Sequence, residues 1–175
     1  MVEKAKYDVV KTIGKIEIRQ YPEMLTAVVE GYEGDSAFGL LFNYISGHNK
    51  KQEKIPMTAP VINSENIDMT SPVLSHEGYM AFIMPSTYTQ ETIPLPLDPH
   101  VKLTVVPEKT VAAIRFGGYT TPSKIQKYEE QLISELKKQN ITTKGNPLLM
   151  RYNSPFAPPF LRRNELGVEI NYASL

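Results

Sequence analysis

Residues 21–29, YPEMLTAVV, have a counterpart 85 positions later at residues 106–114, VPEKTVAAI. Both stretches carry Pro-Glu near the start and a small or β-branched apolar run at the end. Around each, the sequence reads as strand, turn, strand, glycine-containing loop, helix and further strands. Self-similarity at a long period indicates a duplicated unit. We therefore predict two repeats, about residues 16–99 and 100–175, within one domain of residues 1–175. Chance resemblance of two hairpins is the alternative.

Alternating and β-branched apolar runs predict the strands. Ile16–Tyr21 (IEIRQY) is typical of a half-buried strand, and Leu25–Val29 resumes the pattern after Pro22, so together they predict a hairpin around a proline turn. Further strands are predicted at residues 79–84, 101–106, 111–116, 148–152 and 167–172. The proline-rich residues 85–99 are interpreted as an ordered crossover.

Two helices are expected. Asp35 or Ser36 is the predicted N-cap of a helix that ends before Gly47, and Thr121 caps a second helix with Pro122 at its first position. Apolar residues cover roughly 200° of the first helix, whereas a surface helix needs a stripe of ~100°. That helix is either buried on two sides or offers apolar surface to a ligand, and burial on two sides is the favoured interpretation.

A five-residue phrase occurs twice within residues 55–74. Residues 57–61 read MTAPV and residues 69–73 read MTSPV, with turn-forming residues between them. We interpret the two copies as the arms of one antiparallel hairpin. Because proline lacks an N–H, Pro60 and Pro72 are expected at bulges, edges or strand ends. Met57 is expected to fill the core rather than to bind a metal.

Composition excludes several classes of function. Lys+Arg and Asp+Glu are both 19, which argues against a nucleic-acid partner, and the absence of cysteine excludes thiolate chemistry. No apolar run is long enough to span a membrane, so the expectation is a soluble cytoplasmic protein with no membrane partner. His48, His76 and His100 lack metal-ligand spacing and are expected at the surface. We find no catalytic motif and expect neither an enzyme nor a metal site.

Several blocks of the sequence resemble the SOUL heme-binding family. They are IEIRQY at 16–21, KIPMTAPV at 54–61, FIMP at 82–85, RFGGY at 115–119 and YNSPFAPPFLRRNE at 152–165. The resemblance implies an α+β fold, a distorted antiparallel-rich β-barrel of two pseudo-twofold repeats that each carry one α-helix. It also implies a small-molecule ligand, heme or another tetrapyrrole, which is bound without covalent attachment and without a reaction.

The resemblance also implies where that ligand binds, on the first helix and the last loop. The candidate tetrapyrrole-binding residues are Phe38, Gly39, Phe42, Asn43, Phe156, Phe160 and Arg162. The family's proposed histidine ligand is replaced by Gln20, and its basic positions correspond to Asp35, Asn43 and Ala157, none of which is basic. The sequence therefore predicts a weak or altered site.

Two features of this site have more than one interpretation. Gly39 lies inside a helix, where glycine costs about 1 kcal/mol relative to alanine. It serves either the close approach of a loop or a flat platform for a planar ligand. Of Arg162 and Arg163, one is expected to have a structural role in a hydrogen-bond cluster, whereas the other is left open to anion binding.

Two alternatives to tetrapyrrole binding remain at this point. The gyrase-inhibitor-like effector-binding domains share the expected fold, and they suggest a small-molecule effector or scavenging module that uses the cleft between the repeats. The other alternative is an interaction protein that docks a partner through the loop Phe156–Leu161.

Overall fold

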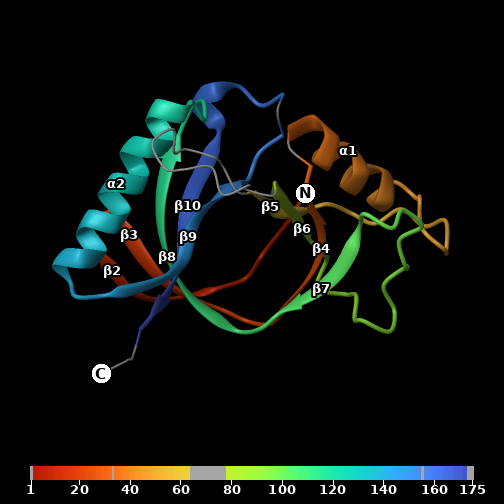
Figure 1. Ribbon diagram of the computed structural model, residues 1–175, viewed down its shortest axis with the longest axis horizontal. Helices are drawn as coiled ribbons and strands as arrows, with labels where there is room; N and C mark the ends of the chain where they lie inside the picture. Colours follow the sequence, from red (N-terminus) through yellow and green to blue (C-terminus); the bar gives the residue numbers. More distant parts are fainter. Residues whose placement is uncertain (1, 33, 64–77, 155, 173–175) are drawn as a thin grey trace. The chain divides into compact units, whose positions relative to one another are not determined.

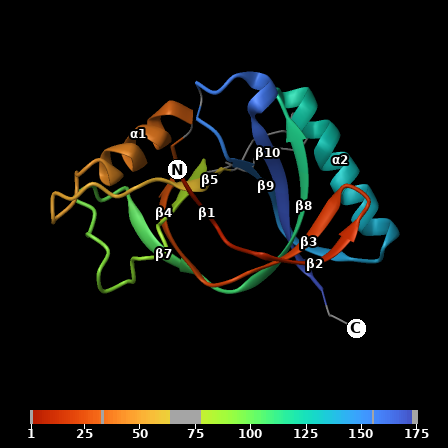
Figure 2. The ribbon, with the colours of Figure 1, turned by 180° about the vertical axis from the view of Figure 1, so that it is seen from behind.

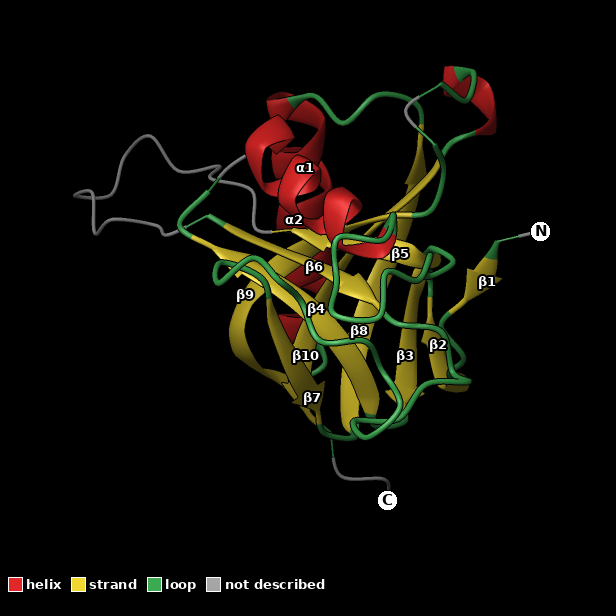
Figure 3. Ribbon diagram, turned by 90° about the vertical axis from the view of Figure 1, so that its right-hand side faces the viewer, coloured by secondary structure: helices red, strands yellow, loops and turns green. Residues whose placement is uncertain are grey.

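The computed structural model describes residues 2–32, 34–63, 78–154 and 156–172. These residues form mostly antiparallel β-structure with two α-helices, α1 (Gly34–Ile45) and α2 (Pro122–Lys138) (Figure 3). The α+β class expected from the sequence is confirmed. The chain divides into two compact units with one helix each: Met1–Ala5 with Glu23–Pro107, and Lys6–Pro22 with Glu108–Leu175. None of the helices in the described part of the chain is long and apolar enough to cross a membrane.

The first unit is a four-stranded antiparallel sheet in the order β5-β6-β4-β7, with a short strand added in parallel on β5. Its strands are β1 (Glu3–Lys4), β4 (Met24–Glu30), β5 (Thr58–Asn63), β6 (Tyr79–Ile83) and β7 (Lys102–Val106). Helix α1 packs against β4 and β6. The core between them is built from Phe82 and Val29 on the sheet side, Leu41 and Tyr44 on the helix side, and Ile55 from the segment before β5.

The second unit is a five-stranded antiparallel sheet in the order β2-β3-β8-β10-β9. Its strands are β2 (Asp8–Ile13), β3 (Ile16–Tyr21), β8 (Lys109–Gly117), β9 (Thr142–Arg151) and β10 (Arg163–Asn171), and the 3-10 helix η1 (Pro159–Leu161) precedes β10. Helix α2 lies along this sheet (Figure 1), with Ile125, Leu132 and Leu136 buried. The hairpin of β2 and β3 is seen from behind in Figure 2.

The predicted hairpin around Pro22 is wrong. Strand β3 pairs with β8, where Ile18 lies opposite Ala112, and β4 pairs with β7, where Ala27 lies opposite Leu103. Both Pro-Glu turns therefore carry the chain from one unit to the other. Neither turn has the Asn-Gly or Gly-X sequence that a tight hairpin needs, and the residue before a proline is held extended. The compact units thus differ from the two halves of the sequence.

The predicted N-cap of α1, Asp35 or Ser36, is wrong, because the helix begins at Gly34 and both residues lie in its first turn. The other predicted signals agree with the structure. Gly47 follows the end of α1 with a φ of +120°, which glycine adopts readily. The hydroxyl of Thr121 caps α2 by accepting from the N–H of Lys124.

The structure describes only the first copy of the doubled phrase, at residues 57–61. Pro60 lies where the register of β5 and β6 shifts between Thr58 and Val61, so its expected place at a bulge is confirmed. Met57 is partly buried against the core, as expected. The second copy of the phrase lies outside the described residues. Neither unit closes its sheet on itself within the described residues, so the barrel and the two repeats stay predictions.

Candidate functional site

One side of α1 is anchored in the core of the first unit. Ala37, Leu41, Tyr44 and Ile45 are buried. The hydroxyl of Tyr44 donates to the carbonyl of Pro94 at 2.6 Å. Burial, with a further contribution from Tyr88, raises the pKa of Tyr44 to about 12, so this hydroxyl stays protonated at physiological pH. The helix is therefore held in a fixed orientation by apolar packing and one buried hydrogen bond.

The other side of α1 carries an exposed aromatic pair. The rings of Phe38 and Phe42 are stacked, with centroids 5.8 Å apart and an interplanar angle of 15°. Phe38 also meets the buried ring of Phe82 edge-on at 5.4 Å, whereas Phe42 is 47% exposed. The predicted burial of α1 on two sides is wrong. The wide apolar arc exists because Phe38 belongs to the core while Phe42 extends the same stack toward solvent.

Gly39 stands beside this stack, one position after Phe38 and three before Phe42. A Cβ atom built at Gly39 meets no other described atom within 4 Å. Among the described residues, no loop approaches closely enough to require glycine here. The close-approach interpretation therefore lacks support, and the flat platform remains. Asn43 follows on the same exposed side of the helix.

The remaining predicted residues lie in the second unit, in the loop between β9 and β10. Phe156 is 95% exposed and Phe160 is 84% exposed. The Nε of Arg162 donates to the carbonyl of Ala157 at 2.8 Å, and its guanidinium lies 5.3 Å from the ring centroid of Tyr119. The seven candidate residues thus form two groups that belong to different units, four on α1 and three in this loop.

The positions at which the chain departs from the family pattern lack free heme ligands. The amide of Gln20 donates to Glu108 at 2.7 Å and accepts from Thr110 at 2.7 Å, so both of its ends are engaged. Asp35 is exposed in the first turn of α1, and the last turn has no basic residue. His48 is exposed, and the exposed ring of His100 is paired with Asp98 at 2.8 Å. His76 lies outside the described residues, among which no group of three potential metal ligands occurs.

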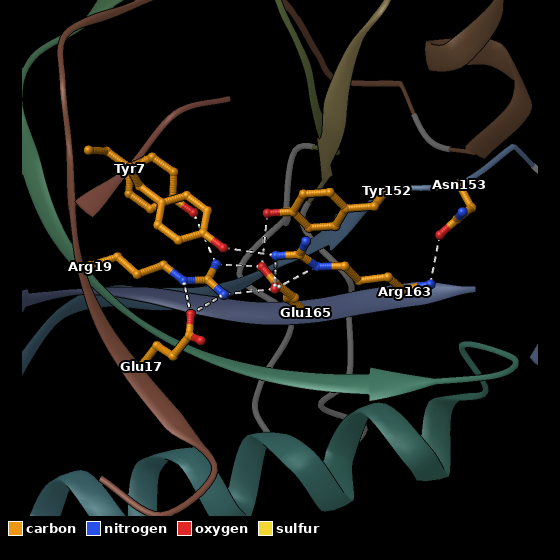
Figure 4. A network of polar contacts seen from close by, with 8 residues as sticks. Tyr7, Glu17, Arg19, Tyr152, Asn153, Arg163 and Glu165 are labelled. Carbon is orange, nitrogen blue, oxygen red and sulfur yellow. Dashed lines mark hydrogen bonds and ion pairs between the residues drawn. The ribbon is translucent and has the colours of Figure 1, made fainter. Parts of the chain in front are cut away.

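The sequence did not predict a buried ionic network in the second unit. The carboxylate of Glu165 is fully buried and accepts two bonds from Arg19, from Nη1 at 2.6 Å and from Nη2 at 2.8 Å. It also accepts from Nη2 of Arg163 at 2.7 Å and from the hydroxyl of Tyr152 at 2.9 Å (Figure 4). The bidentate geometry is among the strongest available to arginine.

Further contacts complete the network. Nε of Arg19 donates to Glu17 at 2.8 Å, and the Arg19 guanidinium lies 4.1 Å from the ring centroid of Tyr7. The hydroxyl of Tyr7 accepts from Arg163 at 3.0 Å. Burial acts to raise the pKa of Glu165, but the hydrogen bonds and charges of both arginines outweigh it and hold that pKa below its usual range. Two cations thus balance two carboxylates, which settles the role of Arg163 as structural.

The order of the strands brings the two main partners of this network together. Arg19 and Glu165 lie on β3 and β10, which flank β8. The small residues Ala113 and Gly167 face each other between them, opposite Glu17. A Cβ at Gly167 would lie 2.6 Å from Cε of Met150 and 3.1 Å from Cγ1 of Val111. The sequence signal was the alternation of Glu17, Arg19 and Tyr21. The segment was interpreted as a half-buried strand, whereas both faces of β3 are largely buried.

Comparisons with known proteins show to which family the chain belongs. The family model described as SOUL heme-binding protein matches residues 2–169. Human Heme-binding protein 2 is 33% identical over 137 residues, which are 75% of this chain and 64% of that protein, so the match spans less than two thirds of the relative.

Solved structures show the fold alone, because their sequence identity is low. The C-terminal domain of EcmrR has a TM-score of 0.61 at 10% identity, covering 95% of this chain and 99% of that one. A hydrolase from Listeria innocua has a TM-score of 0.59 at 13% identity, covering 93% and 94%. The family match covers nearly the whole chain and includes every block singled out in the sequence. The chain belongs to the SOUL heme-binding protein family.

Proposed function

We propose that this protein binds heme or a related tetrapyrrole, without covalent attachment and without a reaction, on the exposed side of α1. The observation that carries the proposal is the stack of Phe38 and Phe42 beside Gly39. Phe42 presents an aromatic surface to solvent, and Gly39 leaves the adjacent helix surface flat. A planar macrocycle gains both aromatic contact and burial of apolar area from such a surface. Family membership and the human relative's name support the same ligand class.

The proposed site fits the macrocycle better than it fits an iron atom. Phe38, Gly39, Phe42 and Asn43 supply none of the usual axial ligands, which are His, Met, Cys and Tyr. Asp35 opposes the propionates, since like charges repel. Arg162 is the candidate counter-ion, but it belongs to the other unit and already bonds Ala157. We therefore expect weak binding that depends little on the metal.

A titration with hemin and with metal-free protoporphyrin tests the proposal. A saturable shift of the Soret band is expected for both, with Kd below about 100 μM, or about −5 to −6 kcal/mol. Phe42→Ala is expected to weaken binding of both by about tenfold or more, because it removes the exposed half of the stack. Leu97→Ala is the matched control, since Leu97 is similarly exposed in the same unit. No saturable shift, or equal binding by Phe42→Ala, would contradict the proposal.

Gly39→Ala separates the effect of this glycine on stability from its effect on hemin binding. Stability is expected to rise by about 0.5–1 kcal/mol, because alanine is the better helix residue and its Cβ meets open space. Hemin binding is expected to weaken, because the methyl group lifts the macrocycle from the helix. Urea unfolding and the Soret titration measure the two effects. A loss of stability would show that something packs against Gly39, and unchanged binding would remove the glycine from the site.

The effector alternative gains no support from the second unit. A buried carboxylate is the natural counter-ion for a lipophilic cation, and Glu165 is such a group. Its charge is already balanced by Arg19 and Arg163. A cation there would have to displace a guanidinium from a bidentate bond. We therefore retain tetrapyrrole binding as the proposed function.

A further inference from the structure

The loop after β9 presents an apolar tip, which we define as Tyr119, Phe156, Phe160 and Leu161. All four side chains are exposed, Phe156 and Phe160 almost completely. Tyr119 belongs to the tip because the Arg162 guanidinium lies against its ring. Water-exposed apolar side chains of this size, gathered at one place, mark an interaction surface more often than chance placement does.

The backbone beneath the tip is ordered by its own hydrogen bonds. The N–H of Ala157 donates to the carbonyl of Ser154 at 2.9 Å, and that of Leu161 donates to the carbonyl of Pro158 at 2.9 Å. The polar side chains of the loop are used internally. Asn153 accepts from the N–H of Arg163, and Ser154 accepts from the N–H of Phe156. The loop therefore holds its apolar side chains outward and offers a partner few side-chain hydrogen bonds.

Two cations border the tip. At the tip itself, Arg162 lies over Tyr119, and Lys124 donates to the carbonyl of Gly117 at the end of β8. Apolar side chains bordered by cations are the chemistry that binds an anionic lipid surface.

We propose that the apolar tip inserts into the interfacial region of a lipid bilayer that contains anionic headgroups. The aromatic and leucine side chains enter the boundary between headgroups and acyl chains, while the neighbouring cations attract the surface. This is peripheral docking, which differs from spanning a membrane, and it replaces the sequence expectation of no membrane partner. A nucleic acid is a poorer fit, because the tip offers few polar groups to contact bases and presents an aliphatic leucine. The inference does not depend on tetrapyrrole binding.

Vesicle co-flotation of the full chain, without any porphyrin, tests this docking. Binding is expected to vesicles of phosphatidylcholine with about 30% phosphatidylserine, at least about tenfold stronger than to phosphatidylcholine alone, and weaker in high salt. The double variant Phe156→Ser/Phe160→Ser is expected to lose about tenfold or more in affinity. Leu97→Ala, at an exposed leucine of the other unit, is the matched control and is expected to bind vesicles as the unchanged protein does. A protein that binds these vesicles but fails the hemin titration would contradict only the proposed function.

A second readout uses the absence of tryptophan from the chain. Phe160→Trp places a single reporter on the tip and keeps it aromatic. Its emission is expected to shift to the blue with anionic vesicles and to be quenched by brominated lipids, as insertion requires. Single-stranded DNA is the polyanion control and is expected to cause neither change. No vesicle binding, unchanged binding by the double serine variant, or an equal response to DNA would overturn the proposal.

Discussion

Replacing Glu165 by glutamine is expected to lower the free energy of unfolding by about 3–5 kcal/mol. The change keeps the size and shape of the side chain but removes the only fully buried carboxylate described in the second unit. Arg19 would keep Glu17, and Arg163 would keep the hydroxyl of Tyr7. One buried and one partly buried guanidinium group would then lose their shared counter-ion, which is costly because removal of one partner leaves uncompensated charge.

Urea unfolding measures this loss, and Glu17→Gln is the matched control. Glu17 also bonds Arg19, but its side chain is 39% exposed. An exposed ion pair contributes about 0–1 kcal/mol, so the control is expected to change stability by that amount at most. At this chain length, the Glu165 variant is expected to melt about 10 °C or more below the unchanged protein. Equal effects of the two substitutions would mean that burial of the network contributes little.

The same carboxylate predicts a dependence of stability on pH. The pKa of Glu165 in the folded state lies below the ordinary value of 4.5 for a glutamate. A group with a lowered pKa stabilises the fold above its unfolded-state pKa, and this contribution is lost as pH falls through the folded-state value. The stability difference between the unchanged protein and Glu165→Gln is therefore expected to narrow below about pH 4.5. A difference that stays constant from pH 7 to pH 3 would mean that folding does not lower the pKa of Glu165.

Local signals in the sequence located both helices, although the predicted N-cap of the first helix was wrong. Thr121 with Pro122, and Gly47 after the first apolar run, mark helix ends through hydrogen bonding and backbone freedom that depend only on neighbouring residues. Strand pairing, in contrast, depends on residues that are far apart in the sequence. The residues around Pro22 do not indicate that β3 pairs with β8 rather than with β4. The pairing depends on which apolar strand faces come together when the chain folds. Strand positions were therefore predicted well and their partners poorly.

The same contrast applies to the candidate site and to the ionic network. A feature that depends on one segment could be inferred from the sequence, whereas a feature that depends on distant segments could not. The exposed aromatic character of Phe42 could be inferred from the excess apolar arc of its helix, although the favoured interpretation was burial. The network around Glu165 could not be inferred from any single segment, since its two strongest partners are 146 residues apart. The alternation of polar residues along a strand is the same in the sequence whether their side chains are hydrated or form a buried ion pair. Only the fold distinguishes the buried case, because it places β3 and β10 on either side of β8.

Leu41 and Phe42 are neighbours on α1. Replacing Leu41 by alanine is expected to lower stability and to leave hemin affinity unchanged, whereas replacing Phe42 by alanine is expected to do the reverse. Leu41 is fully buried against the core, so Leu41→Ala is expected to cost about 2–5 kcal/mol in unfolding free energy. Phe42→Ala removes a half-exposed ring. It loses a stacking contact of about 0.5–1.5 kcal/mol and gains a better helix residue, so its net cost is expected to stay within about 1 kcal/mol.

The two substitutions also separate folding from binding. Leu41→Ala, measured at a temperature at which it remains folded, is expected to keep its hemin affinity, because the exposed side of α1 is unchanged. Phe42→Ala is expected to remain stable and to lose that affinity. Circular dichroism in urea and the Soret titration on the same samples give both quantities. If affinity followed stability in both variants, the helix would matter for ligand binding only through the fold, and the exposed stack of Phe38 and Phe42 would not be the binding surface.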